Sequence, residues 1–177
     1  MVALDLSRAF DTVNIGILMK IILESTLPPT IKRWLGNYLS RRLTYVTFRN
    51  INSKYRRVKQ GVLQGGVLSP TLFNLYMSRL PLPSECIKFI TYADDCTLLF
   101  SSTNIDEICS KLNNFLPVVY NWFVSNQLEI SPEISMLFTT WTKEFKMQLD
   151  LVIGNQHIPT VIRLKVLEFT FDNIQAF

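Results

Sequence analysis

Two apolar runs flank a pair of adjacent aspartates in the middle of the chain. Residues 87–92 and 96–101 are rich in β-branched and aromatic side chains, and only Ala93, Asp94 and Asp95 separate them. This pattern predicts a tight β-hairpin with acidic residues at its tip. Adjacent carboxylates between buried strands repel each other and are costly to desolvate. We therefore expect either a hard divalent cation bound by the two aspartates or an exposed tip on which both acids are solvated.

Composition narrows the class of protein to which this hairpin belongs. The chain has 177 residues, of which 48% are hydrophobic and 18% charged, so we expect one core and one domain spanning residues 1–177. Lys and Arg outnumber Asp and Glu by 18 to 14, and the net charge of +4 suits a polyanionic partner without proving one. The sequence leaves the oligomeric state open.

Cysteine usage and hydropathy bear on the compartment. The three cysteines, Cys86, Cys96 and Cys109, show no Cys-x-x-Cys spacing, which argues against a disulfide framework or a zinc site. No apolar run reaches the ~20 residues that span a bilayer. The first residues lack the features of a signal peptide. We expect an intracellular protein of the nucleus or cytoplasm that is neither secreted nor bound to a membrane.

Periodicity predicts an α+β fold in which helices pack on one face of an antiparallel sheet. Strands are predicted at residues 2–6, in the two runs around the aspartates, in a hairpin of residues 44–49 and 55–59, and in a β-rich end at residues 136–140, 145–153, 161–167 and 169–172. Helices are predicted from Ile15 up to Pro28, over residues 30–38 and 69–79, and in a long stretch that begins at Asn104. The helix over residues 30–38 is expected to bury Ile31, Trp34, Leu35 and Tyr38, and the long helix to bury Trp122.

A third carboxylate lies at the end of the first predicted strand. Asp5 could reach the ions held by Asp94 and Asp95, and such a cluster suits two-metal nucleotidyl transfer. In that chemistry one ion lowers the pKa of an attacking 3′-hydroxyl and the other neutralises charge on the leaving pyrophosphate. Asp11, on the following helix, is expected to be a structural or capping carboxylate.

A glycine-rich loop at residues 60–68 leads into the helix predicted to begin at Ser69-Pro70. Ser69 is expected to cap the free amides of that helix, and Pro70 is preorganised for its first turn. Glycines permit close approach of another chain, and free helix amides favour a phosphate or a base edge. The alternative is a plain connection between a loop and a helix. Upstream of the loop, seven basic residues concentrate positive charge between Arg41 and Lys59.

Five segments of the chain resemble, in order, the palm motifs of reverse transcriptases from non-long-terminal-repeat retrotransposons of the LINE type, jockey-like elements included. Residues 3–14 resemble the first motif, residues 60–77 the second, and residues 92–95, which read Tyr-Ala-Asp-Asp, the third. Residues 122–138 are similar to the fourth motif and residues 164–167 to the fifth. The resemblance covers nearly the whole chain.

This resemblance implies an RNA-directed DNA polymerase, which transfers deoxynucleotides to a primer 3′-hydroxyl on an RNA template. Asp5, Asp94 and Asp95 would be the catalytic carboxylates, and together with the Leu6 carbonyl they would bind two Mg²⁺ ions, with Mn²⁺ as an alternative. The implied nucleotide-binding residues are Arg8, Ala9, Phe10 and Gln64, and the implied template- and primer-binding residues are Gly65, Gly66 and Tyr92.

Two of these roles have ordinary structural alternatives. Phe10 would be a steric gate whose ring occupies the space of a ribose 2′-hydroxyl, or it would simply pack in the core. Tyr92 would back the primer end, or it would be a buried strand tyrosine.

The chain departs from the family pattern at two positions. Ile134 stands where the fourth motif commonly has a lysine that gives a proton to the departing pyrophosphate. Glu168 stands after Leu167 where the fifth motif usually has a glycine, and it is expected to strain a tight turn.

The leading interpretation, a polymerase palm, has two rivals. We expect a partial palm domain with the fingers and thumb largely missing and no endonuclease. One rival is a catalytically decayed remnant that at most binds nucleic acid through Arg41, Arg42, Arg56, Arg57 and Lys59. A viral RNA-dependent RNA polymerase palm is disfavoured, since those typically have Gly-Asp-Asp and lack a gate such as Phe10.

Overall fold

The structure is a computed structural model that describes residues 1–83, 87–132, 134–137 and 149–172. The chain divides into two compact units, one formed by Met1–Ser7 with Leu80–Phe177 and the other by Arg8–Arg79. One domain over residues 1–177 stays a prediction. None of the described helices is both long and apolar enough to cross a membrane. Cys96 and Cys109 are free thiols, and Cys86 lies outside the described residues.

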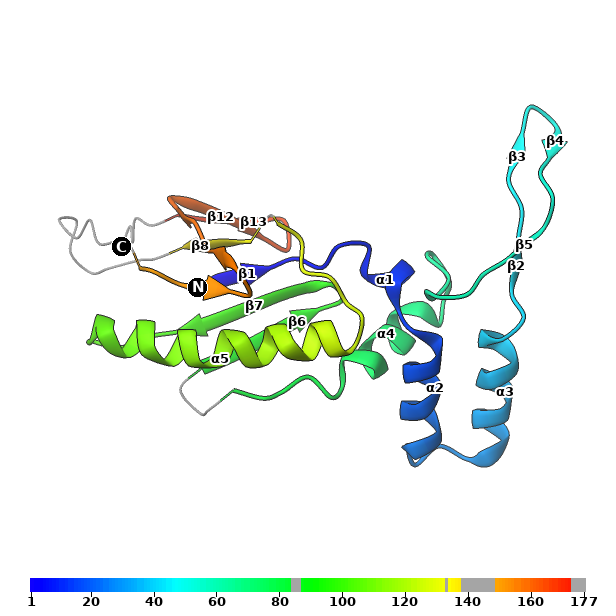
Figure 1. The fold of residues 1–177 in the computed structure, drawn as a ribbon, viewed down its shortest axis with the longest axis horizontal. Helices are drawn as coiled ribbons and strands as arrows, with labels where there is room; N and C mark the ends of the chain where they lie inside the picture. The colour runs from blue at the N-terminus through cyan, green and yellow to red at the C-terminus, as the bar shows by residue number, and fades with distance from the viewer. Residues whose placement is uncertain (84–86, 133, 138–148, 173–177) are drawn as a thin grey trace. The chain divides into compact units, whose positions relative to one another are not determined.

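The unit that contains both chain ends is built on a five-stranded sheet (Figure 1). The strand order is β11 (Thr160–Val161), β8 (Ser135–Leu137), β1 (Val2–Leu4), β7 (Asp95–Phe100) and β6 (Ile87–Tyr92). All neighbouring strands are antiparallel except β8 and β11, which are parallel. The predicted antiparallel sheet is therefore confirmed for three of the four strand pairs and wrong for β8 with β11, so the fold combines helices with a mixed central sheet. A parallel pair needs a crossover connection, which the chain between β8 and β11 supplies with the ribbon of β9 (Val152–Ile153) and β10 (Gln156–His157).

One long helix, α5 (Ile105–Ser125), covers one face of this sheet, as predicted (Figure 1). Asn104 caps it by accepting a hydrogen bond from the Asp106 amide at 2.9 Å. Its buried stripe is Ile108, Leu112, Phe115, Leu116, Val119 and Phe123. Phe115 meets Phe89 of β6 edge to face, with ring centroids 6.2 Å apart. Phe123 takes the buried place expected for Trp122, which is only half-buried.

The β-rich end is confirmed where it is described. Strands β12 (Arg163–Val166) and β13 (Phe169–Asp172) form an antiparallel pair joined by Leu167 and Glu168. Both turn residues are left-handed, with φ of 49° and 68°, as a type I′ turn requires. The strand segments predicted at residues 138–140 and 145–148 lie outside the described residues.

The unit Arg8–Arg79 is helical around a small core. It contains α1 (Ala9–Thr12), α2 (Ile15–Glu24), α3 (Pro29–Leu39) and α4 (Ser69–Met77). The core side chains are Leu18, Ile21, Ile22, Leu35, Leu39, Phe73 and Tyr76. Ile31 and Trp34, predicted to be buried, are exposed, because α3 buries only the stripe of Leu35 and Leu39. Trp34 instead stacks on Tyr38, one turn along the same helix.

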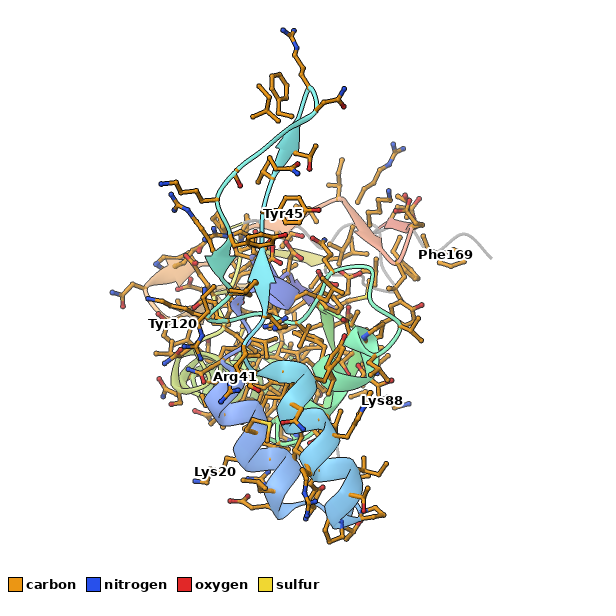
Figure 2. All side chains as sticks on the ribbon, turned by 90° about the vertical axis from the view of Figure 1, so that its right-hand side faces the viewer. Lys20, Arg41, Tyr45, Lys88, Tyr120 and Phe169 are labelled. Carbon is orange, nitrogen blue, oxygen red and sulfur yellow. The ribbon has the colours of Figure 1, made fainter. Side chains whose placement is uncertain are left out.

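Between α3 and α4 lies the predicted basic hairpin, here defined as residues 41–59. Strand β2 (Leu43–Thr44) pairs with β5 (Arg56–Arg57), and β3 (Thr47–Phe48) pairs with β4 (Ile51–Asn52). Two residues separate β2 from β3, whereas three residues separate β4 from β5 on the opposite side of the ribbon. The extra residue makes a bulge. Every residue of these four strands is exposed. In Figure 2 the side chains of the hairpin, with Tyr45 among them, stand out from the ribbon.

Candidate active site

Strand pairing brings Asp5 beside the paired aspartates. In the β1–β7 register Val2 pairs with Leu98, and Leu4 pairs with Cys96. Continuing this antiparallel register by one residue sets Asp5 opposite Asp95. Asp94 is the turn residue next to Asp95, so three carboxylates leave the same end of two neighbouring strands. This convergence of backbone positions was predicted from the sequence.

The turn itself is tighter than the sequence indicated. Tyr92 pairs with Asp95, which is the first residue of β7, so only Ala93 and Asp94 form the turn. Ala93 has φ of 53°, a left-handed conformation that costs a residue with a Cβ atom about 1–2 kcal/mol. Strain of this kind is typical of functional sites, where the surrounding structure holds it in place. We term β6, β7 and their turn the acidic hairpin (residues 87–100).

Negative charge accumulates at the tip of the acidic hairpin. Partial burial raises the pKa of the Asp95 carboxyl, and the charges of Asp94, Asp5 and Glu168 raise it further, in that order. Burial, followed by Asp95, Asp94 and Asp5, raises the pKa of the neighbouring Cys96 thiol to about 12. Four carboxylates therefore act on one another at this end of the sheet, which favours binding of a cation.

The Leu6 carbonyl faces the same edge. Leu6 forms an isolated antiparallel bridge with Ile130, in which the Ser7 amide donates to the backbone carbonyl of Glu129 and the Ser131 amide donates to the backbone carbonyl of Asp5. In such a bridge the amide and carbonyl of the central residue point away from the bridging partner. Ile130 belongs to the segment that leads to β8, on the other side of β1 from β7. The Leu6 carbonyl is therefore directed toward the side of β7 and Asp95.

The donor chemistry of this end of the sheet fits a hard divalent cation. Carboxylate and carbonyl oxygens are the ligands that Mg²⁺ prefers, and Mg²⁺ retains positions for phosphate oxygens. As the side chains stand, no three His, Cys, Asp or Glu residues within the described ranges converge closely enough to hold one metal ion. Asp5, Asp94 and Asp95 thus lie at the same end of the sheet, but their carboxylates do not point to one common metal position.

Glu168 is a carboxylate of this site whose role the sequence did not indicate. An open hollow of about 520 Å³ is lined by Tyr92, Ala93, Asp94 and Asp95 together with Lys165, Leu167 and Glu168. Lys165 Nζ lies 2.6 Å from a Glu168 carboxylate oxygen. Glu168 was expected only to strain its turn, and its φ of 68° agrees with that prediction. The signal that was missed is the Lys-x-x-Glu spacing, which places Lys165 near the end of β12 and Glu168 in the turn that follows, within reach of each other.

Tyr92 stands at the rim of the same hollow. Its side chain is 68% exposed, so the alternative of a buried strand tyrosine is wrong. Tyr92 and Asp95 also line an apolar cavity of about 250 Å³ between the acidic hairpin and β12–β13. The acidic hairpin is thus bordered by a charged hollow and by an apolar cavity.

The departure at Ile134 has a structural counterpart. Ile134 is 3% exposed and packs in the core of its unit, so its position offers no polar side chain to the site. Lys143 and Lys146, the basic residues nearby in sequence, lie outside the described residues.

The remaining residues implied by the resemblance lie in the unit Arg8–Arg79. Phe10 is half-buried and stacks on Phe73 with ring centroids 4.8 Å apart, so core packing accounts for one face of its ring. Ala9 is buried, and Arg8 is exposed with a left-handed φ of 49°. Asp11 does not cap α1, because Arg8 occupies the N-cap position without a side-chain hydrogen bond.

The glycine-rich loop is fastened to α1 through a residue that sequence reasoning passed over. The Gly61 amide donates to Val13 at 2.7 Å, and the Val62 amide donates to Phe10 at 2.8 Å. A Cβ atom on Gly61 would lie 2.6 Å from the Asp11 carbonyl oxygen, so only glycine fits this approach. The Arg42 guanidinium also donates to the Gly61 carbonyl. The first and second motifs are therefore joined through Gly61.

The part of the loop that was expected to bind ligands is more open. Gln64 and Gly65 are exposed, and Gly65 has a left-handed φ of 77° with free space around it. Gly66 is half-buried and lies close to Ser69. The expectation that Ser69 caps α4 is wrong: Leu68 is the N-cap residue, and the Ser69 hydroxyl donates to the Leu63 carbonyl.

Comparisons with known proteins agree with these motifs. Residues 1–149 match the family model described as reverse transcriptase (RNA-dependent DNA polymerase). A probable RNA-directed DNA polymerase from transposon BS of Drosophila melanogaster is 32% identical over 151 residues, which are 80% of this chain and 16% of that protein. RNA-directed DNA polymerases from the mobile element jockey are 30% identical in Drosophila melanogaster and 31% in Drosophila funebris, over 73% and 72% of this chain and 15% of each relative.

The relatives bear out the resemblance stated from the motifs. This chain spans about one sixth of the length of the curated relatives that it matches. The family match nevertheless covers both the end of β1 and the acidic hairpin. The chain therefore belongs to the reverse transcriptase family, and its relatives are polymerases of jockey-like, non-long-terminal-repeat retrotransposons.

Proposed function

We propose that this chain is the palm part of an RNA-directed DNA polymerase, which adds deoxynucleotides to a DNA primer on an RNA template. The observation that carries the proposal is the strand register that sets Asp5 opposite Asp95 and next to Asp94. Family membership supports the reaction class, since the matched relatives bear the name RNA-directed DNA polymerase.

In this proposal Asp5, Asp94, Asp95 and the Leu6 carbonyl hold two Mg²⁺ ions, or Mn²⁺ in their place. Bound there, the ions would supply the charge neutralisation that phosphoryl transfer requires. An aspartate side chain has two rotatable bonds, so carboxylates on adjoining strand positions reach a common point by changing rotamer. The direction of the Asp95 pKa shift supports this grouping, because repulsion from Asp94 and Asp5 raises this pKa in addition to the larger effect of burial.

The other implied residues receive binding roles. Arg8, Ala9, Phe10 and Gln64 would contact the incoming nucleotide, with Phe10 as the gate against a 2′-hydroxyl. Gly65 and Gly66 would lie against the template and primer, and the exposed ring of Tyr92 would back the primer end. The link from Gly61 to α1 supports a shared role for the first two motifs, because displacement of the loop would move Phe10 as well.

Primer extension on poly(rA) with an oligo(dT) primer and Mg²⁺ tests the proposal. The variant Asp94→Asn with Asp95→Asn should reduce incorporation by about 10²–10³-fold or more, because it removes two carboxylates that would hold the Mg²⁺ ions and so the positive charge that would neutralise the transition state. Asp150→Asn is a control, since the Asp150 carboxylate pairs with the exposed His157 and, among the described residues, takes no part in the acidic site. Equal, background-level incorporation by the unmodified chain and the double variant would overturn the enzymatic proposal.

The gate assignment has its own test. Phe10→Val should raise ribonucleotide incorporation relative to deoxynucleotide incorporation, because a smaller side chain leaves room for the 2′-hydroxyl. Phe73→Leu, which alters the ring that Phe10 stacks on, controls for a general loosening of the core. Unchanged sugar selectivity in Phe10→Val would leave core packing as the role of this ring.

A second candidate function is a catalytically decayed remnant that binds nucleic acid without extending a primer. The burial of Ile134 favours it, since the position offers no proton donor for pyrophosphate. The remnant would show salt-dependent binding of an RNA–DNA duplex together with background incorporation.

A further inference from the structure

The basic hairpin (residues 41–59) has an unusual charge. It contains no Asp or Glu and carries seven basic residues: Arg41, Arg42, Arg49, Lys54, Arg56, Arg57 and Lys59. Its positive charge exceeds the net charge of +4 for the whole chain, so the rest of the chain is net negative. The hairpin is therefore the part of this protein that most favours a polyanion.

The same hairpin exposes an unusual amount of apolar surface. Six of its large apolar side chains are exposed by between 46% and 73%, namely Leu43, Tyr45, Val46, Phe48, Ile51 and Tyr55. Two short strand pairs without a covering layer are only marginally stable in water. Contiguous exposed apolar surface rimmed by polar groups is typical of an interaction site. A partner that covers these side chains would stabilise the ribbon.

Aromatic rings and basic residues are interspersed along the ribbon. Tyr45 and Tyr55 meet edge to face across the two strands, with ring centroids 5.0 Å apart. Tyr55 lies between Lys54 and Arg56 in sequence, and the Arg49 guanidinium lies 5.3 Å from the centre of the Phe48 ring. The Phe48 ring therefore has a cation beside it, and Tyr55 has a basic residue on each side in sequence. Arg42 is set apart from this group, because it bonds to the Gly61 carbonyl.

We propose that the basic hairpin is a docking arm for single-stranded nucleic acid. Its cations would pair with phosphates, and Tyr45, Phe48 and Tyr55 would stack on unpaired bases. A duplex hides the faces of its bases, so it would use only the charge. An anionic membrane would likewise use the charge without any requirement for flat rings. The choice of nucleic acid as the partner rests on the proposed polymerase function, whereas the binding itself requires no catalysis.

Stacking is tested by fluorescence anisotropy with the full chain and labelled 20-nucleotide oligo(U) and oligo(dT). Tyr45→Ala with Tyr55→Ala should weaken binding of a single strand by about tenfold or more. Tyr45→Phe with Tyr55→Phe keeps both rings and should bind within about twofold of the unmodified chain. The ratio of oligo(U) to oligo(dT) affinity then shows whether the hairpin prefers an RNA strand or a DNA strand as its ligand.

Charge is tested with two pairs of substitutions that remove the same number of cations. Arg56→Gln with Arg57→Gln should lower the slope of log affinity against log salt by about 1.4 for single strands. Lys20→Gln with Arg33→Gln removes two exposed cations from α2 and α3 and should leave the slope nearly unchanged (Lys20 is labelled in Figure 2). Far-ultraviolet circular dichroism checks that all four variants retain the helices of this unit.

Several results would overturn the proposal. The tyrosine-to-alanine pair could bind single strands like the unmodified chain, or the two cation pairs could change the slope equally. Duplex RNA could bind as tightly as oligo(U), or phosphatidylserine vesicles could compete fully with it. If the unmodified chain extends no primer while the hairpin variants still lose binding, the polymerase proposal fails and the docking arm stands.

Discussion

The acidic hairpin and the basic hairpin are the same local motif in two different settings. Both have a two-residue turn with left-handed residues that are not glycine, Ala93 in the first and Arg49 with Asn50 in the second. The acidic hairpin is paired to β1 and packs against α5, and Leu98 in its second strand is fully buried. Among the described residues the strands of the basic hairpin pair only with one another, and all the residues of its four short strands are exposed.

The contrast shows that packing decides whether a hairpin holds its charge at one fixed place or spreads it along an exposed ribbon. The sheet around the acidic hairpin offsets the cost of a strained turn and of clustered carboxylates, so that charge is held at a fixed place. The basic hairpin lacks such support, and its charge is spread along an exposed ribbon. A fixed negative cluster suits a small cation, whereas a distributed positive ribbon suits a long polyanion.

The largest expected difference between the hairpins is in amide hydrogen exchange. Amides of β7 should exchange only when the sheet opens, whereas those of residues 43–57 should exchange by local opening. We expect protection to differ by about 10³-fold or more, measured by mass spectrometry on peptides from each hairpin. Comparable protection would mean that the basic hairpin is stabilised by the fold as much as the acidic hairpin is.

Removal of a leucine side chain tests the same contrast energetically. Leu98→Ala should lower the free energy of unfolding by about 2–5 kcal/mol, because it leaves a cavity in the sheet core. Leu43→Ala is the matched change in the basic hairpin, and it should cost about 0.5 kcal/mol or less because Leu43 is exposed. Urea denaturation measures both, and similar losses would contradict the division drawn here.

The strained turn gives a smaller effect of opposite sign. Ala93→Gly should stabilise the protein by about 0.5–1 kcal/mol, since glycine adopts the left-handed conformation without steric cost. Asn50→Gly makes the corresponding change in the basic hairpin, where Asn50 has φ of 65°. We expect almost no change in global stability there, because that hairpin opens without unfolding the rest. A loss of stability in Ala93→Gly would show that the Ala93 side chain makes contacts worth more than the strain.

The smallest expected effect is the dependence of stability on pH at Asp95. Because the pKa of Asp95 is raised in the folded protein, its ionisation costs stability as pH rises from its ordinary pKa through the raised value. Asp95→Asn should therefore be slightly more stable than the unmodified chain at pH 7 in EDTA, and the gain should vanish as pH falls below the ordinary pKa. Thermal denaturation across pH measures this gain.

Glu24 provides a control of opposite sign. A hydrogen bond from Arg79 lowers the pKa of Glu24, so the ionised carboxylate contributes stability above its ordinary pKa. Glu24→Gln should be slightly less stable than the unmodified chain at pH 7, with the difference lost as pH falls. If Asp95→Asn followed the profile of Glu24→Gln, the interpretation of Asp95 as a repelled carboxylate would be wrong.

Much of this architecture could be predicted from local patterns. The two apolar runs around Asp94 and Asp95 predicted the acidic hairpin, and Asn104 predicted the start of α5. The parallel pairing of β8 with β11 could not be predicted, because short strands carry no signal for the direction of their neighbour. The exposure of Trp34 was missed because the helical spacing of an aromatic residue does not tell whether its face of the helix is covered by another element.

The site was predicted less evenly. Asp5 was placed correctly at the end of a strand, and the register then set it opposite Asp95. Glu168 was noticed only as a departure from the family motif. Its effect on the pKa of Asp95 was missed, because the two residues belong to hairpins that are distant in sequence. Gly61 was not distinguished from its neighbours, because its requirement for glycine comes from the backbone of Asp11.

The sequence by itself determined the family, the acidic turn and the concentration of basic residues, because these depend on residue type and order along the chain. Only the tertiary structure decided that Glu168 joins the carboxylates of the acidic hairpin and that Ile134 is buried in the core. It also decided that the aromatic rings of the basic hairpin are exposed. The physical reason is that burial and electrostatic coupling depend on distances between segments, which a linear pattern does not contain.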